Sequence, residues 1–145
     1  MAIDLNQLAP ATILANYPGI QVVETQIWTR FLSRAAERYQ GFLYNVRVGE
    51  GFPVPPNARE QEAKFWLDVT MTRIDAIGVR DDTLEIIEIK HNAGHSAIGQ
   101  VIAGRVLAEF EIEDPRPLLQ KIVTNQARPD TITVASVLEI EIFEV

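Results

Sequence analysis

Residues 73–100 read RIDAIGVRDDTLEIIEIKHNAGHSAIGQ, and they contain the clearest secondary-structure signals of the sequence. Two segments of it, residues 73–79 and 84–90, are rich in the residue types that favour β-strands. The intervening residues 80–83 are polar and contain two aspartates, which is a turn signal. We therefore predict a β-hairpin, followed by a short glycine-containing loop and a helix that carries Gln100.

The turn sets the register of this predicted hairpin. Counting outwards from a loop centred on residues 81–82 places Asp75 directly opposite Glu88. Because side chains alternate between the two faces of a strand, Lys90 lies on the same face as Glu88 and Asp75. The same alternation leads us to expect core contacts on the opposite face from Ile74, Ile87 and Ile89.

Two carboxylates that face each other across neighbouring strands repel, so something must compensate for the pair. A shared proton, a divalent cation bound by both acids, or simple exposure to solvent would each do so. Carboxylate oxygens are the ligands that hard cations prefer, and the ammonium group of Lys90 could face a phosphate. An ordinary solvated surface is the alternative, but the core role of the opposite face favours a functional site.

The combination of Asp75, the Glu88-Ile89-Lys90 tripeptide and Gln100 resembles the PD-(D/E)xK nuclease superfamily over about residues 22–123. Ile74 is a departure, because it stands where the proline of the family name would be. The resemblance implies an α/β, restriction-endonuclease-like fold, with a mixed sheet flanked by helices. Its expected order is a helix, three mostly antiparallel strands, a second helix and a strand that pairs beside the hairpin.

The same resemblance implies a metal-dependent nuclease that hydrolyses DNA phosphodiester bonds. Asp75 and Glu88 would then hold Mg²⁺ or Mn²⁺, and a metal-bound water would attack the phosphorus. Lys90 would position that water or neutralise the charge that develops on the phosphate oxygens. Gln100 would orient Lys90 or the attacking water.

A helix is predicted over residues 22–40, with one apolar stripe along its length. Glu24 lies on this stripe, so it either faces solvent in the first turn or points into a site. The resemblance favours the second interpretation, with Glu24 as an outer metal ligand, because many members bring a glutamate from their first helix to the metal. Arg30 and Arg34 follow one edge of the stripe and, with Arg73, are candidate nucleic-acid contacts. For the two helix arginines a solvated surface is the favoured interpretation.

The remaining elements are predicted from local pattern. After a strand over residues 42–48, a loop rich in proline and glycine covers residues 49–57. Residues 58–64 favour a helix, whereas residues 65–72 look extended. Ser96 is expected to cap the helix that carries Gln100. Nearer the C-terminus we expect a strand over residues 118–124, an ambiguous segment over residues 131–137, and a strand with an acidic outer face over residues 138–145.

The length of 145 residues predicts one domain, over residues 22–145, preceded by an N-terminal arm over residues 1–21. The sequence contains no cysteine, which excludes disulfides and thiolate metal sites. It has no apolar run long enough for a membrane span and does not start like a secretory signal, so we expect a cytoplasmic protein. The net charge of −7 comes entirely from residues 81–145, and it predicts weak affinity for free DNA.

A non-catalytic protein is the alternative to the nuclease. The acidic charge and the N-terminal arm also suit a structural or assembly protein, for example a phage particle component that reuses the nuclease fold. Such a protein would be associated with the virion, and it would form a homo-oligomer or a larger assembly through its termini and its C-terminal strand. The costly charge cluster of Asp75, Glu88 and Lys90 favours the nuclease.

Overall fold

A five-stranded mixed sheet forms the centre of the fold in the computed structural model, which describes residues 2–145. Its strands follow one another in chain order across the sheet. The first three are antiparallel, and the last two run parallel to the third. The strands are β1 (Gly41–Val48), β2 (Thr72–Val79), β3 (Leu84–Lys90), β4 (Leu118–Thr124) and β5 (Ile140–Glu144).

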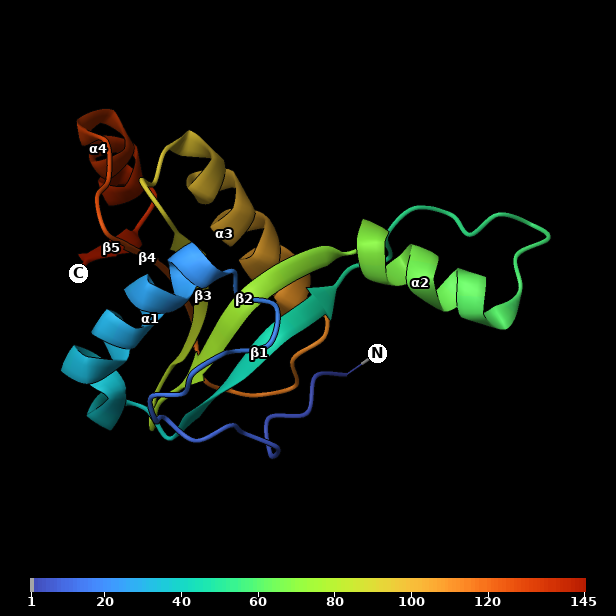
Figure 1. The fold of residues 1–145 in the computed structure, drawn as a ribbon, viewed down its shortest axis with the longest axis horizontal. Coiled ribbons are helices and arrows are strands. Elements are labelled where there is room, and N and C mark those ends of the chain that lie inside the picture. Colours follow the sequence, from blue (N-terminus) through green and yellow to red (C-terminus); the bar gives the residue numbers. More distant parts are fainter. Residues whose placement is uncertain (1) are drawn as a thin grey trace.

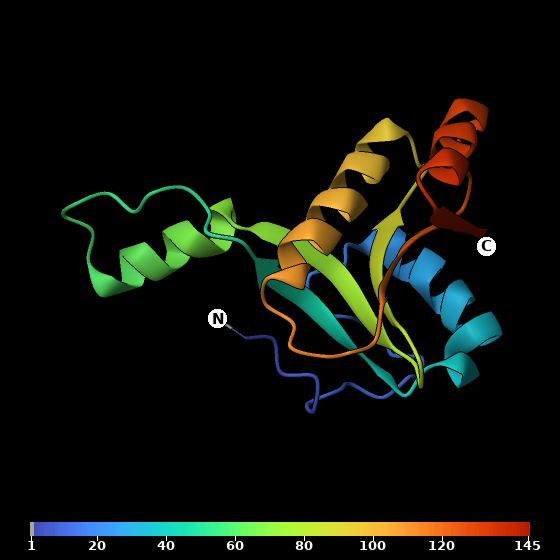
Figure 2. The ribbon, with the colours of Figure 1, turned by 180° about the vertical axis from the view of Figure 1, so that it is seen from behind.

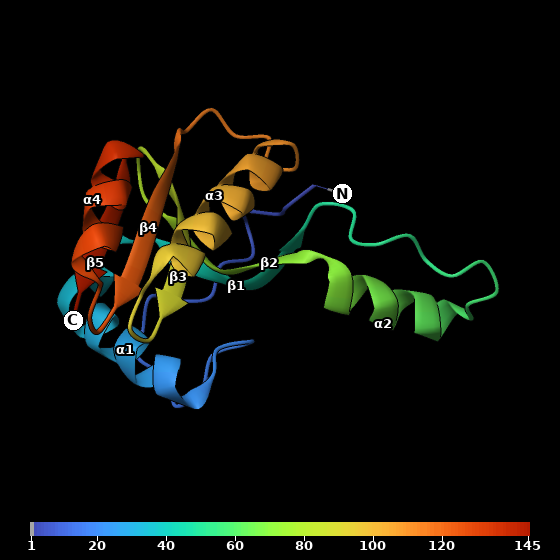
Figure 3. The same ribbon diagram turned by 90° about the horizontal axis from the view of Figure 1, so that it is seen from above.

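Helices cover both faces of this sheet. One face is covered by α1 (Val22–Ala35), which a 3₁₀ turn (Ala36–Arg38) extends, and the other by α3 (His95–Glu109) and α4 (Pro129–Val137) (Figures 1 and 3). The predicted α/β class, with a mixed sheet flanked by helices, is confirmed. No helix within residues 2–145 combines the length and the apolar character that a bilayer crossing requires.

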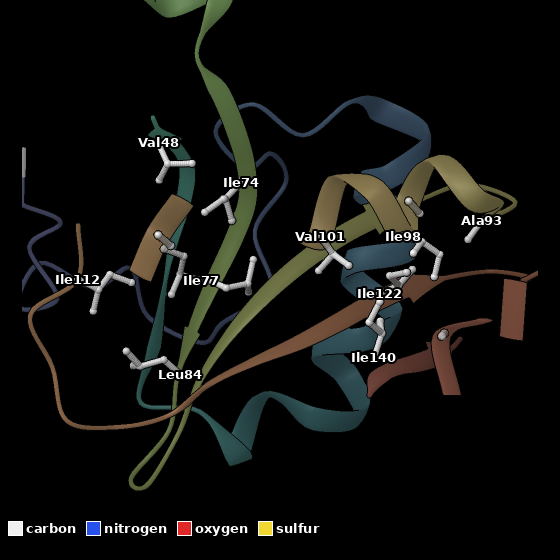
Figure 4. Packing of buried hydrophobic residues seen from close by; sticks show 14 of the residues in the cluster. Val48, Ile74, Ile77, Leu84, Ala93, Ile98, Val101, Ile112, Ile122 and Ile140 are labelled. Atoms are coloured by element: carbon white, nitrogen blue, oxygen red, sulfur yellow. The ribbon is translucent and has the colours of Figure 1, made fainter. Parts of the chain in front are cut away.

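Each face of the sheet has its own hydrophobic core. The core on the α3 side is mostly aliphatic, and Figure 4 shows its side chains gathered between the sheet and α3. The core on the α1 side is aromatic: the indole of Trp28 stacks on Phe31 and donates a hydrogen bond of 2.9 Å to the Tyr44 hydroxyl. Residues 2–20 run along the outer edge of the sheet, where Ala9 pairs with Phe42 of β1 and Tyr17 is buried (Figure 1).

The β2–β3 hairpin has the predicted register. Val79 pairs with Leu84 and Ala76 with Ile87, and the N–H of Arg80 bonds to the carbonyl of Thr83 across the turn. The ladder stops at Ala76 and Ile87, so the next pair in this register, Asp75 and Glu88, lies where the two strands part.

Ile74 does not pack where strict alternation placed it. It belongs to the α3-side core together with Ile77, whereas Ile87 and Ile89 belong to the α1-side core. The reason is an irregularity in the β1–β2 ladder, because Asn45 has a left-handed backbone (φ 54°) and does not pair regularly with Asp75. The alternation of the β2 side chains between the two faces of the sheet is therefore shifted by one residue at Asp75.

The segment expected to be extended over residues 65–72 is helical for most of its length. Helix α2 (Glu60–Thr70) starts with a capping interaction, in which the Glu62 carboxylate accepts the N–H of Arg59 at 3.1 Å. Within residues 2–145 no strand pairs with residues 60–70, so the aromatic and β-branched residues of α2 have no sheet to join. Phe65 and Val69 are instead exposed on an arm, residues 49–70, that projects from the body (Figures 1 and 2).

Two smaller predictions also differ from the structure. Helix α3 begins at His95, one residue before Ser96, and Gly94 occupies the cap position without any side-chain cap. The ambiguous residues 131–137 lie in α4, where Pro129 occupies the first turn. The C-terminal strand is shorter than predicted because α4 and its end take up the residues before Ile140.

Candidate active site

The point where β2 and β3 separate forms the base of an open cleft. The backbone N–H of Ile89 would continue the ladder, but it donates instead to Oδ2 of Asp75 at 3.0 Å. A cavity of about 710 Å³ opens above this point, lined from the end of α2, from β2 and β3, and from one side of α3. Asp75 and Glu88 both line this cavity. The two acids on which the functional prediction rests therefore face the same cavity.

Asp75 is almost completely buried, with 4% of its surface exposed. Its Oδ1 accepts a hydrogen bond of 3.0 Å from Nη2 of Arg73, whose Nη1 donates to the carbonyl of Gly19 at 3.1 Å. Burial raises the pKa of the Asp75 carboxyl, while the hydrogen bond from Ile89 and the charge of Arg73 oppose that rise. Both oxygens of this carboxylate thus have donors within the protein.

Glu88 is buried without a cation of its own. On β4 its neighbour is the apolar Ile122, and no lysine or arginine of residues 2–145 forms an ion pair with it. Burial, and then the negative charge of Asp75, raise the pKa of Glu88 to about 8. A protonated Glu88 carboxyl can donate to Asp75, and this hydrogen bond lowers the pKa of Asp75. The Glu88 proton can therefore be shared between the two acids.

Lys90 and Glu24 lie within electrostatic reach of this pair. The charge of Lys90 lowers the pKa of both Glu88 and Glu24. Burial and the charge of Asp75 raise the pKa of Glu24, which is half-buried at the start of α1. Glu24 lies in the first turn of α1, and neither Glu24 nor Lys90 is among the residues that line the cleft.

The remaining candidate residues divide into two groups. Arg73 and Gln100 line the cleft, Gln100 from the face of α3 that is open to solvent. Arg30 and Arg34 do not line it: both are exposed on α1, and Arg34 donates to the carbonyl of Glu144 on β5 at 3.4 Å.

Sequence reasoning missed Arg47, which also lines the cleft. It pairs with Arg73 across the β1–β2 ladder, and its guanidinium donates to the carbonyl of Asp68 at 2.9 Å and to Oδ1 of Asn45 at 2.7 Å. Pairing residues 41–48 with residues 72–79 in antiparallel register would have revealed it, since that register puts the two arginines side by side.

A second buried acid, Glu85, lies on the opposite face of β3. Its Oε1 is 2.5 Å from Nζ of the buried Lys121 and accepts a hydrogen bond of 3.0 Å from the Tyr39 hydroxyl. Arg80 approaches its other oxygen at 3.4 Å. The ring of Tyr39 fits here because Gly78 lies beneath it, where a β-carbon would come within 2.7 Å of the ring. This cluster is fully neutralised by the protein itself.

Magnesium fits the acids of the cleft only as a partly hydrated ion. Within the part of the chain that the structure describes, no three His, Cys, Asp or Glu side chains lie close enough together to hold a metal ion. Proteins commonly bind Mg²⁺ through one or two carboxylates, with waters and substrate phosphates as the other ligands. Asp75 and Glu88, both buried at the base of an open cleft, provide a donor set of that kind.

Comparisons of the chain with protein-family models, with curated proteins and with solved structures found no match. What the protein does has therefore to be inferred from its own residues. The strongest starting point is the buried acid pair in the cleft.

Proposed function

We propose that this protein is a metal-dependent nuclease that hydrolyses DNA phosphodiester bonds in the cleft between β2, β3 and α3. The observation that carries the proposal is the buried pair of Asp75 and Glu88 at the base of the cleft, with Lys90 close enough for its charge to act on Glu88. Burial raises the pKa of both acids, and the charge of Asp75 raises that of Glu88 further; groups perturbed in this way cost folding free energy and cluster at functional sites. The cleft makes this pair accessible to a substrate.

The proposal includes a restriction-endonuclease-like fold and membership of the PD-(D/E)xK superfamily. Its support is the order of elements, since α1, the β1–β3 meander, α3 and β4 follow one another as the resemblance implies. Helix α2 is an insertion within that order, between β1 and β2.

Bound Mg²⁺ or Mn²⁺ would supply a Lewis acid for the phosphate and an acidified water as nucleophile. Asp75 and Glu88 would hold the ion once Glu88 has lost its proton. Glu24 lies at the edge of this group, where it can accept a hydrogen bond from an ordered water. These roles need all three carboxyls in the charged form, so activity should rise with pH as the proton on Glu88, whose pKa burial raises, is lost to solvent or displaced by the metal.

The basic and amide side chains have separate roles in this proposal. Lys90 directs its ammonium towards the phosphate and stabilises the charge that develops on it. Gln100 offers both a donor and an acceptor from α3 and can orient the attacking water. Arg47 and Arg73 form a positive rim in a protein whose net charge is −7, and would contact neighbouring phosphates.

A plasmid-nicking assay tests the proposal. Purified protein is incubated with supercoiled DNA and Mg²⁺ or Mn²⁺, with EDTA as the metal-free control. We expect nicking that depends on the metal, and we expect Lys90→Ala to lower its rate by at least about 100-fold, the usual effect of removing a group that stabilises transition-state charge. Lys64→Ala is the matched control, because Lys64 is exposed on the arm and should be dispensable.

The assay also has clear negative outcomes. A wild-type protein that never nicks DNA would overturn the proposal, as would a Lys90→Ala variant with full activity. Asp75→Asn, prepared in the same way, guards against a contaminating nuclease, since only the protein's own activity would disappear with that substitution.

One observation favours the assembly protein as second candidate. The arm exposes Phe52, Phe65 and Val69, of which Phe65 is 68% exposed, and none of the α2 residues is buried. Apolar groups presented in this way suit a contact with another protein. Light scattering on the purified chain distinguishes the candidates: a large closed oligomer without nuclease activity would favour assembly, whereas an active monomer or dimer would exclude it.

A further inference from the structure

Arg73 contacts the proposed metal ligand Asp75 in the way that a bound cation would. The two side chains form an ion pair of 3.0 Å, and the carboxylate is buried while the arginine side chain is 39% exposed. A charge-assisted hydrogen bond to a buried acid is among the stronger polar contacts in proteins. In the metal-free protein the guanidinium therefore supplies the positive charge that Asp75 needs.

The arginine has a second anchor, independent of Asp75. Its Nη1 donates to the carbonyl of Gly19 at 3.1 Å. Gly19 has a left-handed backbone (φ 73°), and a β-carbon there would come within 2.5 Å of the Asn45 side chain. The carbonyl is thus held in place by a close backbone approach, and it can keep Arg73 at the rim of the cleft after the bond to Asp75 is broken.

We infer that Arg73 is an internal counter-ion that a divalent cation must displace from Asp75, and that the displaced guanidinium then becomes free to contact a substrate phosphate. This inference rests on the proposed function, because it requires a metal at Asp75 and Glu88. Arg73 is in this sense a positioning residue that couples metal binding to substrate binding. In the metal-free protein Arg73 competes with the metal for Asp75, and in the metal-bound protein it binds the substrate phosphate.

The neighbouring Arg47 provides a natural comparison. It pairs with Arg73 in the sheet and lines the same cleft, but its hydrogen bonds go to Asp68 and Asn45 and not to the acids. Removing Arg47 therefore removes a similar charge from the rim without releasing Asp75.

Calorimetric titration with Mg²⁺ in the absence of DNA tests the inference directly. Arg73→Gln should bind Mg²⁺ about five- to tenfold more tightly than wild type in the same buffer, because the cation no longer has to displace a charge-assisted hydrogen bond from Asp75, the effect of which exposure to solvent reduces. Arg47→Gln should stay within about twofold of wild type. With Ca²⁺ in place of Mg²⁺, Arg73→Gln should bind a short DNA duplex more weakly than wild type.

The outcomes separate this inference from the proposed function. Wild-type protein that does not bind Mg²⁺, or binds it no better than Asp75→Asn, would overturn both. Metal binding that depends on Asp75 but is unchanged or weaker in Arg73→Gln would overturn the inference alone. Arg73→Lys keeps the positive charge but loses the branched guanidinium group, and its thermal unfolding should match that of wild type. If Arg73→Gln fails to fold, Arg73→Met, which also removes the charge, takes its place: an Mg²⁺ affinity equal to or weaker than wild type would overturn the inference, and a tighter one would support it.

Discussion

Glu85 and Glu88 stand three residues apart on one strand, and the protein treats them in opposite ways. Glu85, on the α1 face, has Lys121, Tyr39 and Arg80 around it, and the lysine alone lies 2.5 Å away. Glu88, on the α3 face, has an acid as its polar neighbour, and its pKa rises to about 8. Both are buried, so burial alone does not identify a functional acid.

The neutralisation of a buried acid, and not its burial, distinguishes a structural acid from a functional one. A buried acid that the protein neutralises with its own cations serves the fold. A buried acid without a cation from the protein destabilises the folded state when it is ionised. Binding a proton or an external cation relieves this cost, so such an acid is suited to binding either. Substitutions at the two glutamates should therefore have opposite effects on stability.

The largest effect is expected from Glu85→Gln. It leaves Lys121 charged and buried without its closest partner, and breaking a buried ion pair in this way costs about 3–5 kcal/mol. Urea unfolding monitored by tryptophan fluorescence would measure the loss. The double variant Glu85→Gln/Lys121→Met should recover at least half of it. A Glu85→Gln protein as stable as wild type would show that the cluster is not structural.

A smaller effect of opposite sign is expected from Glu88→Gln. The pKa of Glu88 is raised from an ordinary value near 4.5, so the folded state binds more protons than the unfolded state between about pH 4.5 and pH 8. The free energy of unfolding of the metal-free protein should therefore fall as the pH rises through this window. Glu88→Gln cannot ionise and should be more stable than wild type at pH 8 by roughly 1–3 kcal/mol.

Unfolding curves at pH 5 and pH 8 in EDTA check this sign. The wild type should lose stability between the two, and Glu88→Gln should lose clearly less. If the stability of both proteins changes with pH by the same amount, a group other than Glu88 causes the change between pH 5 and pH 8, and the proton is not shared by Asp75 and Glu88.

The smallest effect is the stabilisation by metal. Mg²⁺ at ten times its dissociation constant should stabilise the wild type by roughly 1.4 kcal/mol, as expected for a ligand that binds only the folded state. Thermal unfolding at pH 8.5 with and without EDTA would measure it. Glu88→Gln should show no such increment, whereas the double variant at Glu85 and Lys121 should keep it. An increment that survives in Glu88→Gln would place the metal elsewhere.

Local sequence patterns predicted those parts of the fold that depend on neighbouring residues. The turn at residues 80–83 fixed the hairpin register, and the strand predicted over residues 118–124 has the observed bounds of β4. Most of the candidate site followed from that register, because Asp75, Glu88 and Lys90 all belong to the hairpin.

Features set by distant residues could not be predicted in the same way. Ile74 changes face because Asn45, on another strand, adopts a left-handed backbone. The bond between Glu85 and Lys121 depends on the parallel pairing of β3 with β4, which no local pattern encodes. Helix α2 was missed in part because its apolar residues suggested a strand, although they lie on an exposed arm.

The way this arm joins the body has a mechanical consequence. Met71 alone separates the end of α2 from the start of β2, and Arg73 follows two residues later. The end of α2 is thus joined to the rim of the cleft by a short stretch of backbone before Arg73 and by the hydrogen bond from Arg47 to the Asp68 carbonyl, so a force applied to the helix near Phe65 would act on both arginines. A surface that grips the projecting helix would thus act on the acid pair without touching it.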